Sequence, residues 1–359
     1  MTAVTTDTPK RRFDISQGSA LRFVVLFGFV SLLADMTYEG ARSITGPWLA
    51  LMGASAAAVG FVAGLGELLG YTLRIVSGYL VDRTGRYWLL TLIGYTSNLI
   101  AVPLMAVAGR WEIASLLIVA ERSGKAIRVP SRDAMLSHAT SAMGRGLGFG
   151  LHEAMDRTGA MLGPLVVAGV LYLAAQANGQ ASSGYQAAFA ILAIPALLAL
   201  GTLATARALY PNPRDLEVKK ITLERAGLSR AYWLYVVGVA CIAAGYADFP
   251  LIAYHLQKNA VMAPTLIPIL YAAAMAVNGI SALTFGRLFD KLGAPALIAA
   301  ALLSSVFAPL TFSFISKVYE AVYRQFVQLM GVTEKEVETG AQVFANMLPL
   351  LFLIFLIGF

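Results

Sequence analysis

Long apolar runs alternate with short polar connections along the whole chain. Residues 21–33, 88–107, 187–203 and 351–359 carry few charges or none, and charged residues gather between such runs. A helix needs about 20 apolar residues to cross the hydrocarbon core of a bilayer, where only helices or closed barrels satisfy their backbone groups. Because the runs lack the alternation of barrel strands, the pattern predicts an all-α polytopic membrane protein.

The polar connections divide the chain into about ten expected spans. A polar stretch that contains Pro211 and Pro213 interrupts the helical pattern after the sixth span. Before the final apolar run, the expected spans cover residues 20–50, 55–81, 88–109, 112–136, 143–175, 185–206, 231–257, 264–288 and 293–315.

These spans predict five consecutive parts of the chain. Two of the parts are polar, and we expect both of them to lie in the cytoplasm. The predicted order is a disordered N-terminus (1–19), an N-terminal six-helix bundle (20–206), a linker (207–230), a partial C-terminal bundle (231–315) and an atypical amphipathic segment with a final apolar helix (316–359).

Composition and charge support a membrane location. Hydrophobic residues make up 58% of the chain and charged residues 13%, whereas soluble domains have about 45–50% and about 25%. The net charge of +7 comes from alternate connections, which the positive-inside rule places in the cytoplasm with the N-terminus. This alternation excludes nucleic acid as a partner and predicts the cytoplasmic (inner) membrane. The basic residues concerned are Lys10, Arg11, Arg12, Arg83, Arg86, Arg145, Arg207, Arg214, Lys219, Lys220, Arg225, Arg230, Arg287 and Lys291.

The sequence offers no motif for a cofactor or a metal. The single cysteine, Cys241, excludes an internal disulfide and a cysteine-based zinc site. The segment Ser123-Gly124-Lys125 lacks the spacing of a phosphate loop, and His152 has no second histidine at metal-ligand spacing. Because no nucleotide-binding motif is found, we expect the protein to draw its energy from an ion gradient or from the gradient of its solute.

An internal repeat relates the two halves of the chain. The segments 78–85 and 286–293 both read Gly-x-Leu-x-Asp-x-x-Gly and lie 208 residues apart. Asp35 and Asp248, each preceded by alanine, lie 213 residues apart. Parallel repeats of this kind are typical of transporters built from two halves related by an axis along the membrane normal.

The repeated segment resembles the signature loop between spans two and three of the major facilitator superfamily. Gly159-x-x-x-Gly163-Pro164 is similar to the antiporter-type motif of that family. The resemblance covers residues 20–313 and implies two pseudo-symmetric bundles around a midplane cavity. A member should have twelve spans, so we expect the second bundle to be incomplete and the C-terminus to be truncated or foreign.

The resemblance also implies roles for its own motif residues. Asp82 is expected to cap a neighbouring helix, to pair with Arg83 or Arg86 and to lock one conformation, unless the loop is merely solvated. The glycines are expected to allow close contact between helices. The expected gating residues are Gly78, Asp82, Arg83, Gly85, Arg86, Gly286, Asp290 and Gly293, and the expected packing residues are Gly159, Gly163 and Pro164.

Charged side chains inside the expected spans are the main candidates for function. A charge in lipid costs several kcal/mol unless it faces water or a partner, so these residues predict an aqueous cavity. In the first span Asp35, Tyr38, Glu39 and Arg42 share one helical face. The other candidates for the substrate and proton pathway are Glu67, Tyr71, Arg74, Glu121, Arg122, Lys125, His152, Glu153, Asp156, Arg157 and Asp248.

Two interpretations of these charges stay open. Either they form ion pairs that hold the early spans together, or some of them bind the solute and titrate as it moves. We expect Asp35 to carry a proton and Arg122 to anchor a substrate anion, because both lie deep in their spans. Tyr271 and Asn278 could line the opposite wall of the cavity.

These observations favour secondary active transport of a small solute by a monomer without cofactors, coupled to protons. Antiport is favoured over uptake on the basis of the Gly159–Pro164 motif alone. A membrane-embedded hydrolase that uses His152, Glu153 and Asp156 is the alternative from another class, although no nucleophile stands out beside His152. A non-transporting sensor or a truncated fragment is the third possibility.

Overall fold

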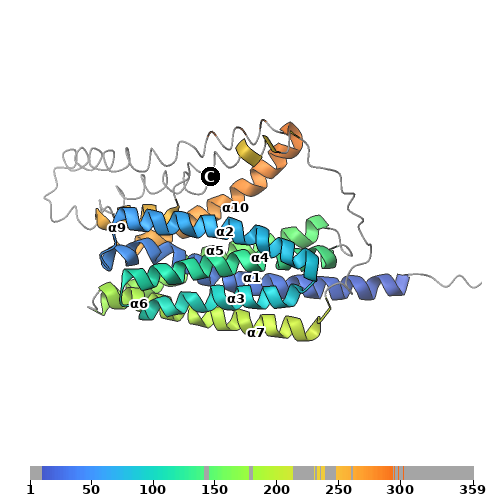
Figure 1. The fold of residues 1–359 in the computed structure, drawn as a ribbon, viewed down its shortest axis with the longest axis horizontal. Helices are drawn as coiled ribbons and strands as arrows, with labels where there is room; N and C mark the ends of the chain where they lie inside the picture. The colour runs from blue at the N-terminus through green and yellow to red at the C-terminus, as the bar shows by residue number, and fades with distance from the viewer. Residues whose placement is uncertain are drawn as a thin grey trace, which may run out of the picture.

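The computed structural model of the protein describes residues 10–140, 145–177, 181–212, 248–259 and 262–293, and a few single positions between 230 and 302. All regular elements in this part of the chain are helices, which run roughly parallel to one another in one elongated bundle (Figure 1). The prediction of an all-α fold is confirmed. The helices are α1 (Lys10–Leu51), α2 (Ala56–Thr84), α3 (Tyr87–Leu104), η1 (Met105–Val107), α4 (Trp111–Thr140), α5 (Arg145–Gln176), α6 (Ala181–Ile191), α7 (Ala193–Leu209), α9 (Phe249–Lys258) and α10 (Leu266–Leu292).

Five stretches of helix are long and apolar enough to cross a membrane: Gly18–Leu51, Ala56–Thr84, Tyr87–Val107, Gly148–Gln176 and Ser182–Leu209. The last of these joins α6 and α7 into one span. Helix α4 has 30 residues, or about 45 Å of length, but its charges keep it out of this apolar group. It packs against both α2 and α3, and its Arg128 is fully buried.

Helix α1 begins earlier than the sequence predicts. Residues 10–19 were expected to be disordered, but α1 already begins at Lys10 and has 42 residues. No proline precedes Pro47 within this helix, so the polar start can continue the helical backbone of the apolar part. Residues 1–9, most of the predicted linker (213–229) and the whole predicted final segment (316–359) lie outside the described residues.

The repeated glycine segment has the same backbone in both copies. Gly85 follows the last residue of α2 with φ of 62°, and Gly293 follows the last residue of α10 with φ of 67°. Glycine adopts this left-handed conformation without the penalty that a Cβ atom imposes, and it commonly ends helices. The two glycines thus end equivalent helices, while Gly286 and Asp290 lie within α10.

Close packing between α1 and α5 depends on two of the predicted glycines. A Cβ atom on Gly159 would overlap the backbone of Leu32, and one on Gly163 would overlap that of Met36. The two glycines thus permit a close approach of α1 and α5, and Pro164 lies buried next to this contact. Gly78 is different, because a Cβ atom there would make only an ordinary contact with Pro130, 3.7 Å away.

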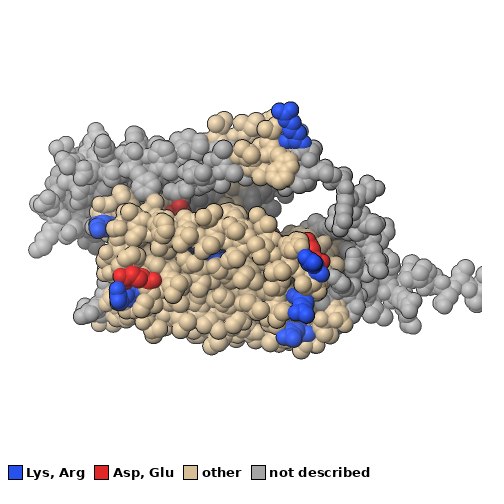
Figure 2. Space-filling view, viewed as in Figure 1, with Lys and Arg blue, Asp and Glu red and all other residues tan. Residues whose placement is uncertain are grey.

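The two ends of the bundle differ in charge. Lys and Arg side chains gather at the end where α2 and α7 finish, which we call the basic end (Figure 2). Arg83, Arg86 and Arg207 belong to it. At the opposite end Arg110 pairs with Glu112 at 3.0 Å, so its charge is locally compensated.

Candidate functional site

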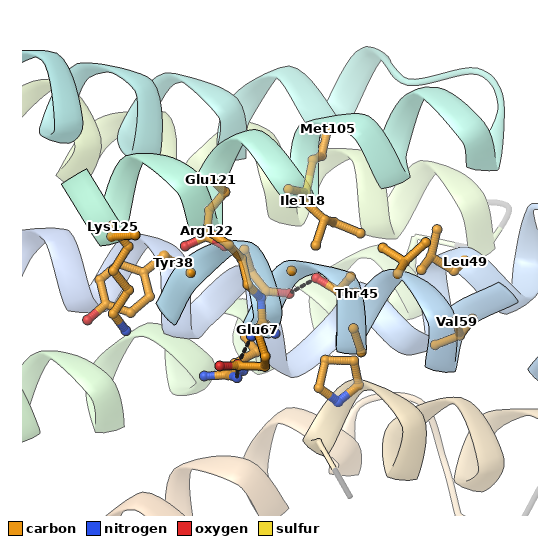
Figure 3. Close-up of a pocket in the computed structure, with 18 of the residues that line it drawn as sticks. Tyr38, Thr45, Leu49, Val59, Glu67, Met105, Ile118, Glu121, Arg122 and Lys125 are labelled. Carbon is orange, nitrogen blue, oxygen red and sulfur yellow. Dashed lines mark hydrogen bonds and ion pairs between the residues drawn. The ribbon is translucent and has the colours of Figure 1, made fainter. Parts of the chain in front are cut away.

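A cavity of about 340 Å³ lies between α1, α2 and α4, and Pro250 at the start of α9 borders it. Its volume falls at the lower end of the range of about 300–1,000 Å³ that is usual for small-molecule sites. Eight of the predicted pathway residues line this cavity, and their side chains come from the three long helices (Figure 3). The eight are Tyr38, Arg42, Glu67, Tyr71, Arg74, Glu121, Arg122 and Lys125.

Four charges form a closed ring, which we call the ion ring: Arg42, Glu67 and Arg122, which line the cavity, and Asp248, which contacts both arginines. Arg42 donates to Glu67 at 3.1 Å and to Asp248 at 2.9 Å. Arg122 pairs with Glu67 and donates to Asp248 at 2.6 Å. Each arginine thus contacts both carboxylates, and charge-assisted bonds of this type are the strong ones in proteins. The ring joins α1, α2 and α4 to the beginning of α9.

Asp248 was expected inside the span 231–257, but it lies at the start of α9. Its backbone is extended (φ −71°, ψ 143°) and it is the N-cap residue of α9. Pro250 is placed where proline is favoured, in the first turn of the helix. The Asp248 side chain does not cap its own helix, because both of its oxygens bind arginines from α1 and α4.

Glu39 makes a second connection between the early helices and α10. Its carboxylate accepts hydrogen bonds from Lys125 at 3.5 Å and from the Tyr271 hydroxyl at 2.5 Å. The Lys125 ammonium also lies 3.9 Å from the centre of the Tyr38 ring, a distance suited to a cation–π interaction. Glu39 is buried, and its partners lie on two other helices, α4 and α10.

Glu121 is held by a residue that the sequence analysis did not single out. The Asn98 side-chain amide donates to the Glu121 carboxylate at 2.8 Å and to the Glu121 backbone carbonyl at 3.1 Å. Asn98 is fully buried on α3. A sequence signal was available, because an amide inside the charge-free run 88–107 needs a partner when it is buried.

A second polar group, which we call the Arg128 cluster, consists of Arg128, Tyr95 and Tyr38, of which only Tyr38 lines the cavity. Arg128 is fully buried, and its guanidinium carbon is 4.2 Å from the Tyr95 ring centre and 5.4 Å from that of Tyr38. None of its three side-chain nitrogens has a hydrogen-bond acceptor among the described residues. Asp35 accepts a hydrogen bond from Tyr38 beside this cluster and does not line the cavity. The expectation that Asp35 faces the cavity is therefore wrong.

His152 does not have the geometry of a hydrolase. Its Nε2 atom lies 3.4 Å from the Ser31 hydroxyl and 3.9 Å from Asp156, whereas a catalytic triad uses the two ring nitrogens for different partners. Its Nδ1 atom is buried without a partner among the described residues. Neither His152 nor Ser31 borders the cavity, so the described geometry does not favour the enzyme alternative.

The remaining predicted residues on α5 make separate contacts. Asp156 lies 3.7 Å from Arg132, a residue that the sequence analysis missed. Arg157 pairs with Glu153 at 2.7 Å and donates to the Asn278 side chain of α10, also at 2.7 Å. Arg157 thus provides a third polar connection between the early helices and the segment after the linker.

The predicted gating loop differs in detail from the expectation. Asp82 is exposed, and among the described residues it forms no ion pair with Arg83 or Arg86. Arg83 instead donates to the hydroxyl of Tyr79, one turn earlier on α2, at 2.8 Å. In the described part of the chain no group of three His, Cys, Asp or Glu side chains could hold a metal ion.

Sequence comparisons relate the chain to transporters. A family model described as Major Facilitator Superfamily matches residues 21–358. An uncharacterized protein of Mycobacterium tuberculosis is 43% identical over 292 residues, which cover 80% of this chain and 70% of that protein. An uncharacterized MFS-type transporter of Methanocaldococcus jannaschii is 32% identical over 151 residues, which cover 42% of this chain and 38% of that protein.

Solved structures share the fold at low sequence identity. A bacterial homologue of the human lysosomal transporter Spinster, inward-facing and unoccupied, has a TM-score of 0.57 and 15% identity and covers 96% of this chain and 80% of its own. A nucleoside transporter has a TM-score of 0.57 and 12% identity, with coverage of 94% and 80%. The chain spans only 60% of a bacterial homologue of the human drug peptide transporters. As the resemblance implied, the chain belongs to the major facilitator superfamily.

Proposed function

We propose that the protein is a secondary active transporter that carries a small solute across the cytoplasmic membrane by alternating access. The observation that carries this proposal is the ion ring at the cavity. It joins three helices of the first part of the chain to Asp248, which follows the linker. Rocking of two halves around a central site requires contacts that can break and form again.

Further contacts around α9 support a closed end of the cavity. A Cβ atom on Gly46 would overlap the carbonyl group of Pro250, so α1 and α9 touch through their backbones. The Tyr254 hydroxyl donates to the carbonyl of Ala54, which precedes α2, at 2.9 Å. At the other end of the bundle the last turns of α10 project away from α2 and α4 (Figure 1). We infer that the cavity opens toward the basic end in this conformation.

The basic end is proposed to face the cytoplasm. Arg83, Arg86 and Arg207 gather there, and positively charged connections stay on the cytoplasmic side during insertion. The N-terminus of α1 lies at the same end (Figure 1). In this orientation the described conformation is open to the cytoplasm.

Proton coupling is proposed to depend on Asp35. This carboxyl group is buried, and its only hydrogen-bond partner among the described residues is the Tyr38 hydroxyl. The Tyr38 ring also borders the cavity and contacts Lys125. A change of charge on Asp35 can thus act on the cavity through Tyr38, without direct contact with the solute. The preference for antiport rests on the Gly159–Pro164 motif.

Reconstituted vesicles with an internal pH indicator test this function. We expect at least one class of small solute to cause proton flux when it is added under a pH gradient. Asp35→Asn should reduce this flux at least tenfold, whereas Arg110→Gln, a change at an exposed ion pair outside the cavity, should leave it unchanged. Solute uptake without any proton movement would contradict coupling, and the lack of both would contradict transport.

A further inference from the structure

The two ends of the cavity differ in chemistry. One end carries the charged and tyrosine side chains, and the other is lined by hydrocarbon, as Figure 3 shows for Glu67, Arg122 and Lys125 against Leu49 and Val59. Thr45 lies between the two ends in the same view. A ligand that fills the whole cavity must therefore present a polar group at one end and an apolar body at the other.

The apolar end of the cavity is lined by buried side chains and does not lie on the outer surface. Its side chains are at most 7% exposed, so they are packed among the helices rather than on the outer surface. Water is poorly held in a space lined by hydrocarbon, and such cavities bind apolar groups instead. The side chains concerned are Leu49, Val59, Val62, Met105 and Ile118.

The charged end has more hydrogen-bond donors than acceptors. Four cations and two carboxylates line the cavity, and Glu39 and Asp248, which are not among its lining residues, pair with three of these cations. The Nε atom of Arg42 is buried and has no acceptor among the described residues. Arg74 lies 5.7 Å from the ring centre of Tyr71 and forms no ion pair with any described residue.

The carboxylates around the cavity, in contrast, already have donors. Glu67 and Asp248 each bind two arginines, and Glu39 binds Lys125 and Tyr271. Glu121 binds the Asn98 amide. A ligand that supplies acceptors would satisfy the free donors, whereas a ligand that supplies donors would compete with bonds that are already made.

We propose that the cavity binds an amphipathic organic anion. Its carboxylate or phosphate group would lie among Arg42, Arg74 and Lys125, and its apolar body would fill the pocket between Val62 and Ile118. Guanidinium groups suit such anions because they offer several donors in a planar arrangement. The inference rests on the proposed transport function for its physiological meaning, but binding itself can be measured without transport.

Equilibrium binding to the purified full chain in detergent tests the inference with four matched probes. These are 4-phenylbutyrate, 4-phenylbutylamine, 4-phenylbutanol and acetate, which separate the contributions of charge and of the apolar body. We expect saturable binding of 4-phenylbutyrate at least tenfold tighter than that of each other probe. Preferential binding of the amine, or no saturable binding of 4-phenylbutyrate, would overturn the proposal.

Variants of both ends locate the bound probe. Arg74→Gln should weaken 4-phenylbutyrate binding at least fivefold, and Arg74→Lys should retain more of it. Val62→Asn should weaken 4-phenylbutyrate but leave the weak binding of acetate unchanged, because acetate has no body to fill the apolar end. Arg110→Gln, at an exposed pair outside the cavity, is the matched control for loss of an arginine. Binding that neither Arg74→Gln nor Val62→Asn changes would place the probe elsewhere and overturn the proposal.

The two proposals can fail separately. If the reconstituted protein transports 4-phenylbutylamine but neither binds nor transports 4-phenylbutyrate, the proposed substrate class is wrong and the proposed transport function stands. If the anion binds with the expected dependence on Arg74 and Val62 but no solute of any class moves, the site stands and transport is wrong.

Discussion

The ion ring and the Arg128 cluster place arginines in opposite situations. In the ring, Arg42 and Arg122 share two carboxylates, and their side chains are 26% and 11% exposed beside a cavity. In the cluster, Arg128 is fully buried between two tyrosine rings and has no carboxylate partner among the described residues. Only the ring includes a residue from beyond the linker.

This difference separates charges that can exchange partners from a charge that is fixed. When α9 moves, Arg42 and Arg122 each lose Asp248 and keep Glu67, and water from the cavity can replace the lost bonds. Arg128 is fully buried and has no alternative partner among the described residues, so we expect its charge to act on Asp35 and Tyr38 as a constant. We therefore expect substitutions in the ring to destabilise the described conformation. Removal of the buried charge of Arg128 should instead leave the stability unchanged or raise it.

Arg122→Met should have the largest effect. It leaves Glu67 and Asp248 with Arg42 as their common partner, and removing one side of a buried charge pair costs up to about 3 kcal/mol; water at Glu67, which is 42% exposed, should reduce this cost. We expect a lower denaturation midpoint of the purified protein. A midpoint equal to that of the wild type would show that the ring contributes no net stability.

Asp248→Asn should have a smaller effect, because the amide keeps the shape of the side chain and one acceptor oxygen. Loss of the charge should weaken the closed end by about 2 kcal/mol. The test places a cysteine in the cavity by Thr45→Cys, in a Cys241→Ser background. Asp248→Asn should accelerate labelling of this cysteine by a thiol reagent that is added on the side opposite the basic end. Tyr254→Phe removes a neutral hydrogen bond at the same end and should accelerate labelling less.

Arg128→Met should leave the protein as stable as the wild type or stabilise it by about 1 kcal/mol. The reason is that an apolar side chain removes a buried charge without leaving a carboxylate unpaired. The same denaturation experiment checks this result. A loss as large as that of Arg122→Met would show that the two regions do not differ as described.

Arg110→Gln should have the smallest effect. Its partner Glu112 is exposed, and such surface pairs contribute about 0–1 kcal/mol. Thermal unfolding, binding and flux should all match the wild type within error. A large change would mean that the opposite end of α4 also takes part in the mechanism.

The helices could be predicted because their signal is local. The expected spans 55–81 and 88–109 end within a few residues of α2 and of η1. The loop contacts of Asp82 were less predictable, since a carboxylate at a helix end has several possible partners. Helical periodicity fixes where a helix lies along the chain but not which neighbour it meets.

The site could be predicted only in part, for the same reason. Tyr38 and Arg42 line the cavity as their common helical face suggested, but Asp35 lies farther along that face and meets the Arg128 cluster instead. The bond between Arg42 and Asp248 joins residues 206 positions apart, and no periodicity reveals such a pair. Asn98 was the one partner whose sequence position gave a usable signal.

A distance measurement across the closed end tests the central claim most directly. Ala56→Cys and Lys258→Cys place spin labels on two exposed positions that border one pocket between α2 and α9, in a Cys241→Ser background reconstituted in lipid. We expect a dominant short distance and a minor longer one in the wild type, and an increase of the longer population with Asp248→Asn. A single distance distribution that Asp248→Asn leaves unchanged would contradict a closed end held by the ion ring.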